Sequence, residues 1–136
     1  MMRLFGRFLR ISRTCAIIVF SLSGFGISLN ASAQNLKGPL ETGWQGEKVC
    51  EKLSENKQNR ILRCTFAPGV GHEKHKHNAN FGYALSGGTM QITDDKGTRS
   101  VNLKTDSHFD SQGTKWHKVL NVGDTTVIYL IVERKK

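Results

Sequence analysis

Apolar and polar residues alternate over short stretches along much of the chain, and turn-forming residues separate these stretches. Alternation with a period of two places every second side chain on one face, which is typical of half-buried β-strands. The segment 125–133, TTVIYLIVE, is instead almost continuously apolar and rich in β-branched residues, so it predicts a strand in the middle of a sheet. No helical period of useful length follows residue 34. About seven or eight short strands in one small unit predict an all-β sandwich or small barrel.

Glycine-containing breaks mark where these strands should end. They include the run 86–88 (SGG) and the segment 110–115 (DSQGTK), which we interpret as loops. The stretch 93–97, TDDKG, lies between two strand-like segments and ends in Gly97. Because glycine suits a left-handed turn position, this stretch predicts a β-hairpin.

The first 33 residues have the layout of a secretory signal peptide. Four arginines and no acidic residue precede an apolar run at 16–27, and Ala-Ser-Ala at 31–33 resembles a cleavage site. A membrane anchor is the alternative, but this run is shorter than the roughly 18 apolar residues that a spanning helix needs. We therefore expect cleavage before Gln34, a periplasmic or secreted protein, and no stable membrane insertion afterwards.

The remaining chain, 34–136, is short enough for one domain. We interpret 34–58 as an N-terminal extension and first strand, and 59–136 as the β-barrel domain. The net charge of +9 falls when the four leader arginines leave, because 16 basic residues then face 11 acidic ones. No basic face with stacking aromatic residues is evident, so we expect no nucleic-acid partner. The charge favours solubility and, weakly, anionic ligands.

Two cysteines, Cys50 and Cys64, remain after cleavage of the leader. An even number of cysteines in an exported protein indicates a disulfide, and two free buried thiols are the alternative. If the polar stretch 54–59 forms the turn of a hairpin, the two cysteines lie opposite each other, where a bridge can form. A disulfide between them is therefore predicted.

Three of the five histidines lie in the segment 71–77, GHEKHKH. In an extended strand His75 and His77 project to one face, while Lys74 and Lys76 project to the other. Two imidazoles on one face can hold a divalent metal ion, although a pair with this spacing also occurs by chance on exposed strands. His72 is out of phase with the pair in strand terms.

A further histidine, His117, lies in GTKWHKVLNVGD at 113–124, just before another strand-like segment. Together the two stretches resemble the two motifs of the cupin superfamily, over roughly residues 60–134. The matching positions are Gly69, His75, His77 and Gly87 for the first motif, and Gly113, His117 and Asn121 for the second. The second motif departs from the usual pattern in having Ser111 where a proline is common and one extra residue before its histidine. This resemblance implies a cupin-type jelly roll, also called a double-stranded β-helix barrel, with a metal in its mouth.

The first motif also departs from the family pattern, because Asn80 occupies the position of the usual glutamate. The resemblance therefore implies His75, His77 and His117 as metal ligands, with Asn80 as a weak additional ligand. Three protein ligands leave open positions for water or substrate. The ion would be Fe, Mn, Ni or Zn, and its identity is not predicted. The alternative is a metal-free cupin with an apolar pocket.

The sequence also suggests positions for the two remaining histidines and for three aromatic residues. We place His72 at the rim of the pocket and His108 in a loop, and we expect Phe81, Tyr83 and Trp116 in the core or the pocket wall.

Three functions are compatible with this sequence. The first is a metal-dependent enzyme acting on a small, anionic organic molecule, with dioxygenase-like chemistry for iron or hydrolase- or isomerase-like chemistry for zinc. The second is a non-catalytic cupin that binds a small ligand or a metal in the cell envelope. The third is a structural β-sandwich with a vestigial metal site. A homodimer is an open alternative in each case, and fold alone does not decide among them.

Overall fold

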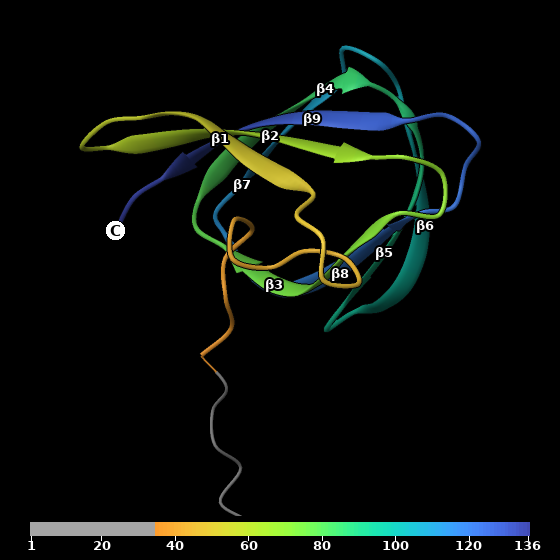
Figure 1. The fold of residues 1–136 in the computed structure, drawn as a ribbon, viewed down its shortest axis with the longest axis horizontal. Coiled ribbons are helices and arrows are strands. Elements are labelled where there is room, and N and C mark those ends of the chain that lie inside the picture. Colours follow the sequence, from red (N-terminus) through yellow and green to blue (C-terminus); the bar gives the residue numbers. More distant parts are fainter. Residues whose placement is uncertain (1–34) are drawn as a thin grey trace, which may run out of the picture. The chain divides into compact units, whose positions relative to one another are not determined.

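The computed structural model describes residues 35–136 (Figure 1). The predicted leader sequence and its predicted cleavage site lie outside the described residues. The described part folds into nine β-strands and contains no helix, so no helix within it could cross a membrane. The all-β prediction is confirmed, with one or two strands more than expected.

The strands form two antiparallel sheets. The five-stranded sheet has the order β1 (Cys50–Glu55), β2 (Asn59–Phe66), β9 (Val127–Arg134), β4 (Asn80–Ser86), β7 (His108–Ser111). The four-stranded sheet has the order β3 (Gly71–His77), β8 (Thr114–Asn121), β5 (Gly88–Asp94), β6 (Gly97–Leu103). Neighbours in these orders are often distant in sequence, and Figure 1 shows β3 and β8 lying side by side.

The apolar run near the C-terminus forms β9, the middle strand of the five-stranded sheet. Val127 and Ile131 are buried in the core with Leu62 and Phe66 of β2 and Met90 of β5. Because both sheets contribute to this cluster, the predicted central position of the strand is confirmed, and its inward side chains join the two layers.

The hairpin at the N-terminal end of the domain has the predicted register. Cys50 of β1 pairs with Cys64 of β2, and their sulfur atoms form a disulfide with a Cα–Cα distance of 4.0 Å. This hairpin belongs to the five-stranded sheet, so the boundary that we placed between residues 58 and 59 falls in its turn. The second predicted hairpin joins β5 and β6, and Gly97 has a φ of +103°.

The lead-in before β1 covers the free edge of β3 (orange in Figure 1). The carbonyl of Lys37 accepts a hydrogen bond from the Lys76 N–H at 3.0 Å, and the carbonyl of Gly43 accepts one from the Glu73 N–H at 2.9 Å. These bonds satisfy backbone groups that an edge strand would otherwise leave unpaired. The histidine-bearing strand is thus held from both sides, by β8 and by this segment.

Candidate metal centre

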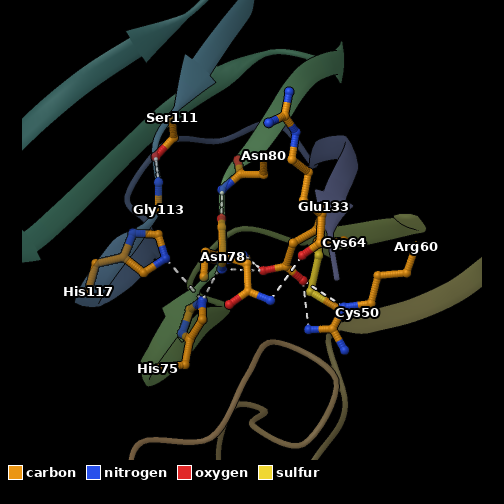
Figure 2. Close-up of polar contacts among 12 residues, drawn as sticks. Cys50, Arg60, Cys64, His75, Asn78, Asn80, Ser111, Gly113, His117 and Glu133 are labelled. Atoms are coloured by element: carbon orange, nitrogen blue, oxygen red, sulfur yellow. Dashed lines mark hydrogen bonds and ion pairs between the residues drawn. A yellow bond between two sulfur atoms is a disulfide. The ribbon is translucent and has the colours of Figure 1, made fainter. Parts of the chain in front are cut away.

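The three histidines identified by their motifs come together between β3 and β8. His75 pairs directly with His117 across the two strands, and Figure 2 shows their rings turned toward each other. The Nε2 atom of His75 lies 3.0 Å from the Nε2 atom of His77 and 3.0 Å from that of His117. One ligand atom from each of the three residues lies within 4.8 Å of the others. The grouping of these residues is therefore a property of the fold.

Hydrogen bonds at the other ring nitrogen orient two of these imidazoles. The Nδ1 atom of His75 lies 2.6 Å from the carbonyl oxygen of Glu73, and the Nδ1 atom of His77 lies 3.2 Å from Oε1 of Glu133. A carbonyl and a carboxylate only accept hydrogen bonds, so both Nδ1 atoms carry the proton. In the neutral rings the Nε2 atoms of His75 and His77 then each present a lone pair, as metal ligands require.

Glu133 is fully buried at the end of β9 and connects the histidines to an arginine. Its Oε2 atom accepts a hydrogen bond from Nε of Arg60 at 2.6 Å, and its Oε1 atom accepts one from the Asn78 N–H at 2.8 Å (Figure 2). Burial raises the pKa of this carboxyl group, but the bonds from His77, Arg60 and the Asn78 N–H outweigh burial, so the pKa lies below its usual value. Glu133 therefore remains ionised and can hold His77 in one orientation.

His72 is buried against the ring of His75, and the prediction that it occupies the rim is wrong. Its ring is 2% exposed and stacks on His75, with ring centroids 3.7 Å apart and an interplanar angle of 30°. Its Nδ1 atom lies 3.9 Å from the sulfur of Cys50. The pairing of β3 with β8 is irregular between His72 and His75, where two residues of β3, Glu73 and Lys74, lie opposite one residue of β8, Lys118. Because of this β-bulge, His72 lies on the same inward face as His75, whereas in a regular strand it would lie on the opposite face.

Burial disfavours the charged form of His72, His75 and His117. Loss of hydration is the main cause that lowers the pKa of His72 to about 4, of His75 to about 2 and of His117 to about 3. The neighbouring imidazoles add to the effect on each ring. Since only a neutral imidazole can ligate a metal, the fold favours the form that binding needs.

The histidines line one part of a cavity of about 370 Å³ between the two sheets. Asn80, the residue at the position of the usual cupin glutamate, also lines it and donates from Nδ2 to the carbonyl of Asn78 at 2.8 Å. The role of Asn80 as a weak metal ligand stays a prediction.

The aromatic residues predicted as pocket wall lie elsewhere. Phe81 is exposed and stacks on His108, the hydroxyl of Tyr83 donates to Asp106 at 2.9 Å, and the ring of Trp116 is covered by the Lys74 ammonium at 4.3 Å. None of the three lines the cavity within residues 35–136. Their positions in β4 and β8 alternate with inward residues, so their side chains point to the outer faces. His108 begins strand β7, which corrects its assignment to a loop.

The nitrogen positions fit a divalent ion. Two nitrogens about 2.0–2.1 Å from a shared ion lie about 3.3–3.4 Å apart at the tetrahedral angle that zinc prefers, and about 2.9 Å apart at the right angle of an octahedral ion. The 3.0 Å between the Nε2 atoms of His75 and His77 lies between these two values. Facing lone pairs repel unless a proton or a cation lies between them, and the low pKa of His75 disfavours the proton. The arrangement is therefore the one that a bound metal would stabilise.

Comparison with known proteins supports the fold. No protein-family profile and no curated protein sequence matches the chain. A cupin domain from Bordetella pertussis Tohama I has a TM-score of 0.60 and 18% identity, over 65% of this chain and 93% of that chain. A cupin superfamily protein from Desulfitobacterium hafniense DCB-2 has a TM-score of 0.51 and 17% identity, over 64% of this chain and 76% of that chain.

A third solved structure is that of a predicted oxalate decarboxylase from Thermotoga maritima, with a TM-score of 0.50 and 22% identity, over 64% of this chain and 79% of that chain. At these identities the likeness concerns the fold. Both this likeness and the two antiparallel sheets agree with the resemblance of the histidine motifs, and the described part of the chain therefore has the fold of the cupin superfamily.

Proposed function

We propose that this protein binds a divalent metal ion through His75, His77 and His117 and uses it to bind, and to transform, a small organic molecule in the adjoining cavity. The observation that carries the proposal is the convergence of three imidazoles, with the lone-pair-bearing Nε2 atoms of His75 and His77 3.0 Å apart and the ligand atoms of all three histidines within 4.8 Å of one another. Buried polar atoms in such an arrangement need a shared partner. A metal ion satisfies three imidazoles at once.

Each protein residue has a definite part in this proposal. The three imidazoles hold the ion, while Glu133 and the carbonyl of Glu73 fix the rings of His77 and His75. Apolar side chains, among them Ile92 and Val101, line the adjoining cavity and would contact the apolar part of a bound molecule. When bound, the ion would supply Lewis acidity or redox chemistry to a small substrate. Iron would favour dioxygenase-like chemistry, and zinc would favour hydrolysis or isomerisation.

We also propose that the protein is exported. The Cys50–Cys64 disulfide supports this location, because disulfides persist in oxidising compartments and are rare in the cytosol. The mass of the mature protein, purified from the periplasm or the medium, should correspond to a chain that begins at Gln34. A protein that retains its first 33 residues would contradict the proposal.

Metal analysis tests the metal site. Protein from metal-replete cells should carry about one equivalent of a divalent ion, and His117→Ala should fold but lose most of it. His108→Ala is the matched control, because among the described residues His108 is the one histidine that neither belongs to the metal group nor lines the cavity. Acidification should release the ion, because protonated imidazole cannot ligate.

A second outcome of the metal analysis would contradict the metal site. If the wild-type protein carries no stoichiometric metal, and added Fe(II), Mn(II), Ni(II) or Zn(II) binds it no better than His75→Ala, then the site is vestigial. The function would then be binding of a small ligand in the cavity, without a metal. Turnover of small organic acids under air, measured on the metal-loaded protein, separates an enzyme from a binding protein.

A further inference from the structure

The cavity is chemically polarised along strands β5 and β6. Met90 of β5 pairs with Val101 of β6, and Ile92 pairs with Arg99, so these four side chains share the face that lines the cavity. Asp94 lies two residues beyond Ile92 on the same face and also lines the cavity. The inner surface of this hairpin is therefore apolar over most of its length and charged at the end formed by Asp94 and Arg99.

The charged end lies on the side of the metal histidines. In the pairing of β5 with β8, Ile92 lies opposite Val119 and Thr93 lies opposite Lys118. Continuing this antiparallel register by one residue brings Asp94 beside His117. The opposite end of the same strand pair, where Met90 lies opposite Asn121, belongs to the apolar core.

The Asp94 carboxylate holds the guanidinium of Arg99 in place. Its Oδ2 atom lies 2.8 Å from Nη2 of Arg99, and its Oδ1 atom accepts the Lys96 N–H at 2.9 Å. Both carboxylate oxygens are thus engaged, whereas the contact with Asp94 uses one side of the guanidinium and leaves donors at Nη1 and Nε. Arg99 is about half exposed, at 48% of its side chain, so a ligand entering the cavity can reach these donors.

We propose that the site binds a small amphipathic monocarboxylate, with its carboxylate between the histidine cluster and Arg99 and its apolar tail along Ile92 and Val101. The metal half of this proposal rests on the proposed function, while the Arg99 half does not. A planar guanidinium matches the geometry of a carboxylate and forms stronger hydrogen bonds with it than a neutral donor does. The apolar stripe then selects for a hydrocarbon tail rather than a polar one.

Charge balance favours a monoanion. Asp94 and Arg99 neutralise each other, so the ligand meets only the charge of the metal ion, which three neutral imidazoles leave uncompensated. A second negative charge on the ligand would face the Asp94 carboxylate and lack a partner of its own. Inorganic phosphate and dicarboxylates should therefore bind more weakly than a monocarboxylate with an apolar tail.

Calorimetric titration with hexanoate, acetate and 1-hexanol tests each part of the ligand. Hexanoate should bind more tightly than acetate, which lacks the tail, and more tightly than 1-hexanol, which lacks the charge. Arg99→Gln should weaken hexanoate binding about tenfold, the effect of one charge-assisted contact, and leave 1-hexanol unchanged. The hexanoate affinity of Arg99→Lys should lie between those of the wild type and Arg99→Gln, because lysine keeps the charge but loses the paired donors of the planar guanidinium.

Arg63→Gln is the matched control. Arg63 is as exposed as Arg99, at 48% of its side chain, and lies 2.7 Å from a carboxylate oxygen of Glu51, but it lies outside the cavity. This variant should bind hexanoate like the wild type. If Arg99→Gln and Arg63→Gln bind hexanoate equally well, or if 1-hexanol or phosphate binds as tightly as hexanoate, the proposal is overturned.

Metal content separates this proposal from the proposed function. Repeating the titrations on chelator-treated protein should weaken hexanoate binding, yet the difference between Arg99→Gln and Arg63→Gln should remain. If the untreated protein carries no metal and takes up none on titration, the metal site is refuted, and a difference that persists between the two variants still supports the role of Arg99. If the protein binds metal but Arg99→Gln and Arg63→Gln bind hexanoate equally well, the metal site is supported and the role of Arg99 is refuted.

Discussion

The Nδ1 atom of His77 lies 3.2 Å from Oε1 of Glu133, a fully buried carboxylate that Arg60 holds from the other side. Second partners of this kind fix the ring orientation and raise the basicity of a metal-binding imidazole. Glu133 does not reach the point where the three Nε2 atoms converge, so we assign it a positioning role.

Glu133→Gln should weaken metal binding about 10- to 100-fold, the usual effect of losing such a partner. Glutamine keeps the shape but loses the charge, so His77 is oriented less firmly and is less basic. Titration of a divalent ion into the metal-free variant gives the affinity. The control is Glu51→Gln, which removes an exposed carboxylate paired with Arg63. An equal metal affinity for wild type and Glu133→Gln would show that the carboxylate does not serve the site.

His72 supports His75 from below, and its removal should affect both stability and metal binding. His72→Ala leaves a buried void beneath the stacked ring and should lower the free energy of unfolding by about 2 kcal/mol or more. With that support gone, His75 can shift, and metal affinity should fall. Chemical denaturation and metal titration measure the two effects.

His72→Phe provides the informative comparison. Phenylalanine keeps a ring against His75 and removes the Nε2 atom of His72, which is buried and has no hydrogen-bond partner in the described structure. Stability should therefore stay closer to that of the wild type than the stability of His72→Ala does, because the ring still fills the buried space against His75. Loss of metal in His72→Phe as complete as in His72→Ala would mean that the imidazole itself, rather than its packing, is needed.

The sequence was sufficient to predict the fold class and the three convergent histidines. Strand periodicity placed His75 and His77 on one face, and the resemblance to cupin motifs added His117 from a distant strand. The pairing of Cys50 with Cys64 followed from the register of a local hairpin. These predictions succeeded because each depends on short-range spacing or on a recognisable motif.

Other parts of the site depend on long-range register and could not be predicted in this way. The burial of His72 requires an extra residue in β3, which a period of two cannot reveal. Glu133 meets Arg60 and Asn80 only because β9 lies between β2 and β4. One signal was available: Glu133 shares the inward alternation of Tyr129 and Ile131, and a charged residue at such a position usually has a partner.

The disulfide should contribute substantially to stability. Both cysteines are buried, and the loop-entropy account gives about 3 kcal/mol for a closed loop of roughly 15 residues. Cys64→Ala should therefore lower the midpoint of thermal unfolding by more than about 10 °C, as a loss of this size does in a domain of about 100 residues. Thiol titration of the unfolded, unreduced wild type should detect no free cysteine in the mature chain. Two reactive thiols would show that the bridge does not form in solution.

Tyr129 should make the stability of the domain fall at alkaline pH. Burial raises the pKa of its phenol from 10.0 to about 12. A raised pKa in the folded state means that the stabilisation is complete below pH 10, where both states are protonated. It is lost as the pH rises from about 10 to about 12, because the unfolded chain releases its proton first. Chemical denaturation at a series of alkaline pH values should show a smaller decline in the free energy of unfolding for Tyr129→Phe than for the wild type.

Tyr83→Phe is the control and leaves Tyr129 as the only tyrosine of the chain, so the phenolate absorbance of that variant reports Tyr129 directly. If that absorbance appears with a midpoint near 10 in the folded protein, Tyr129 is in contact with water and the predicted decline should be absent.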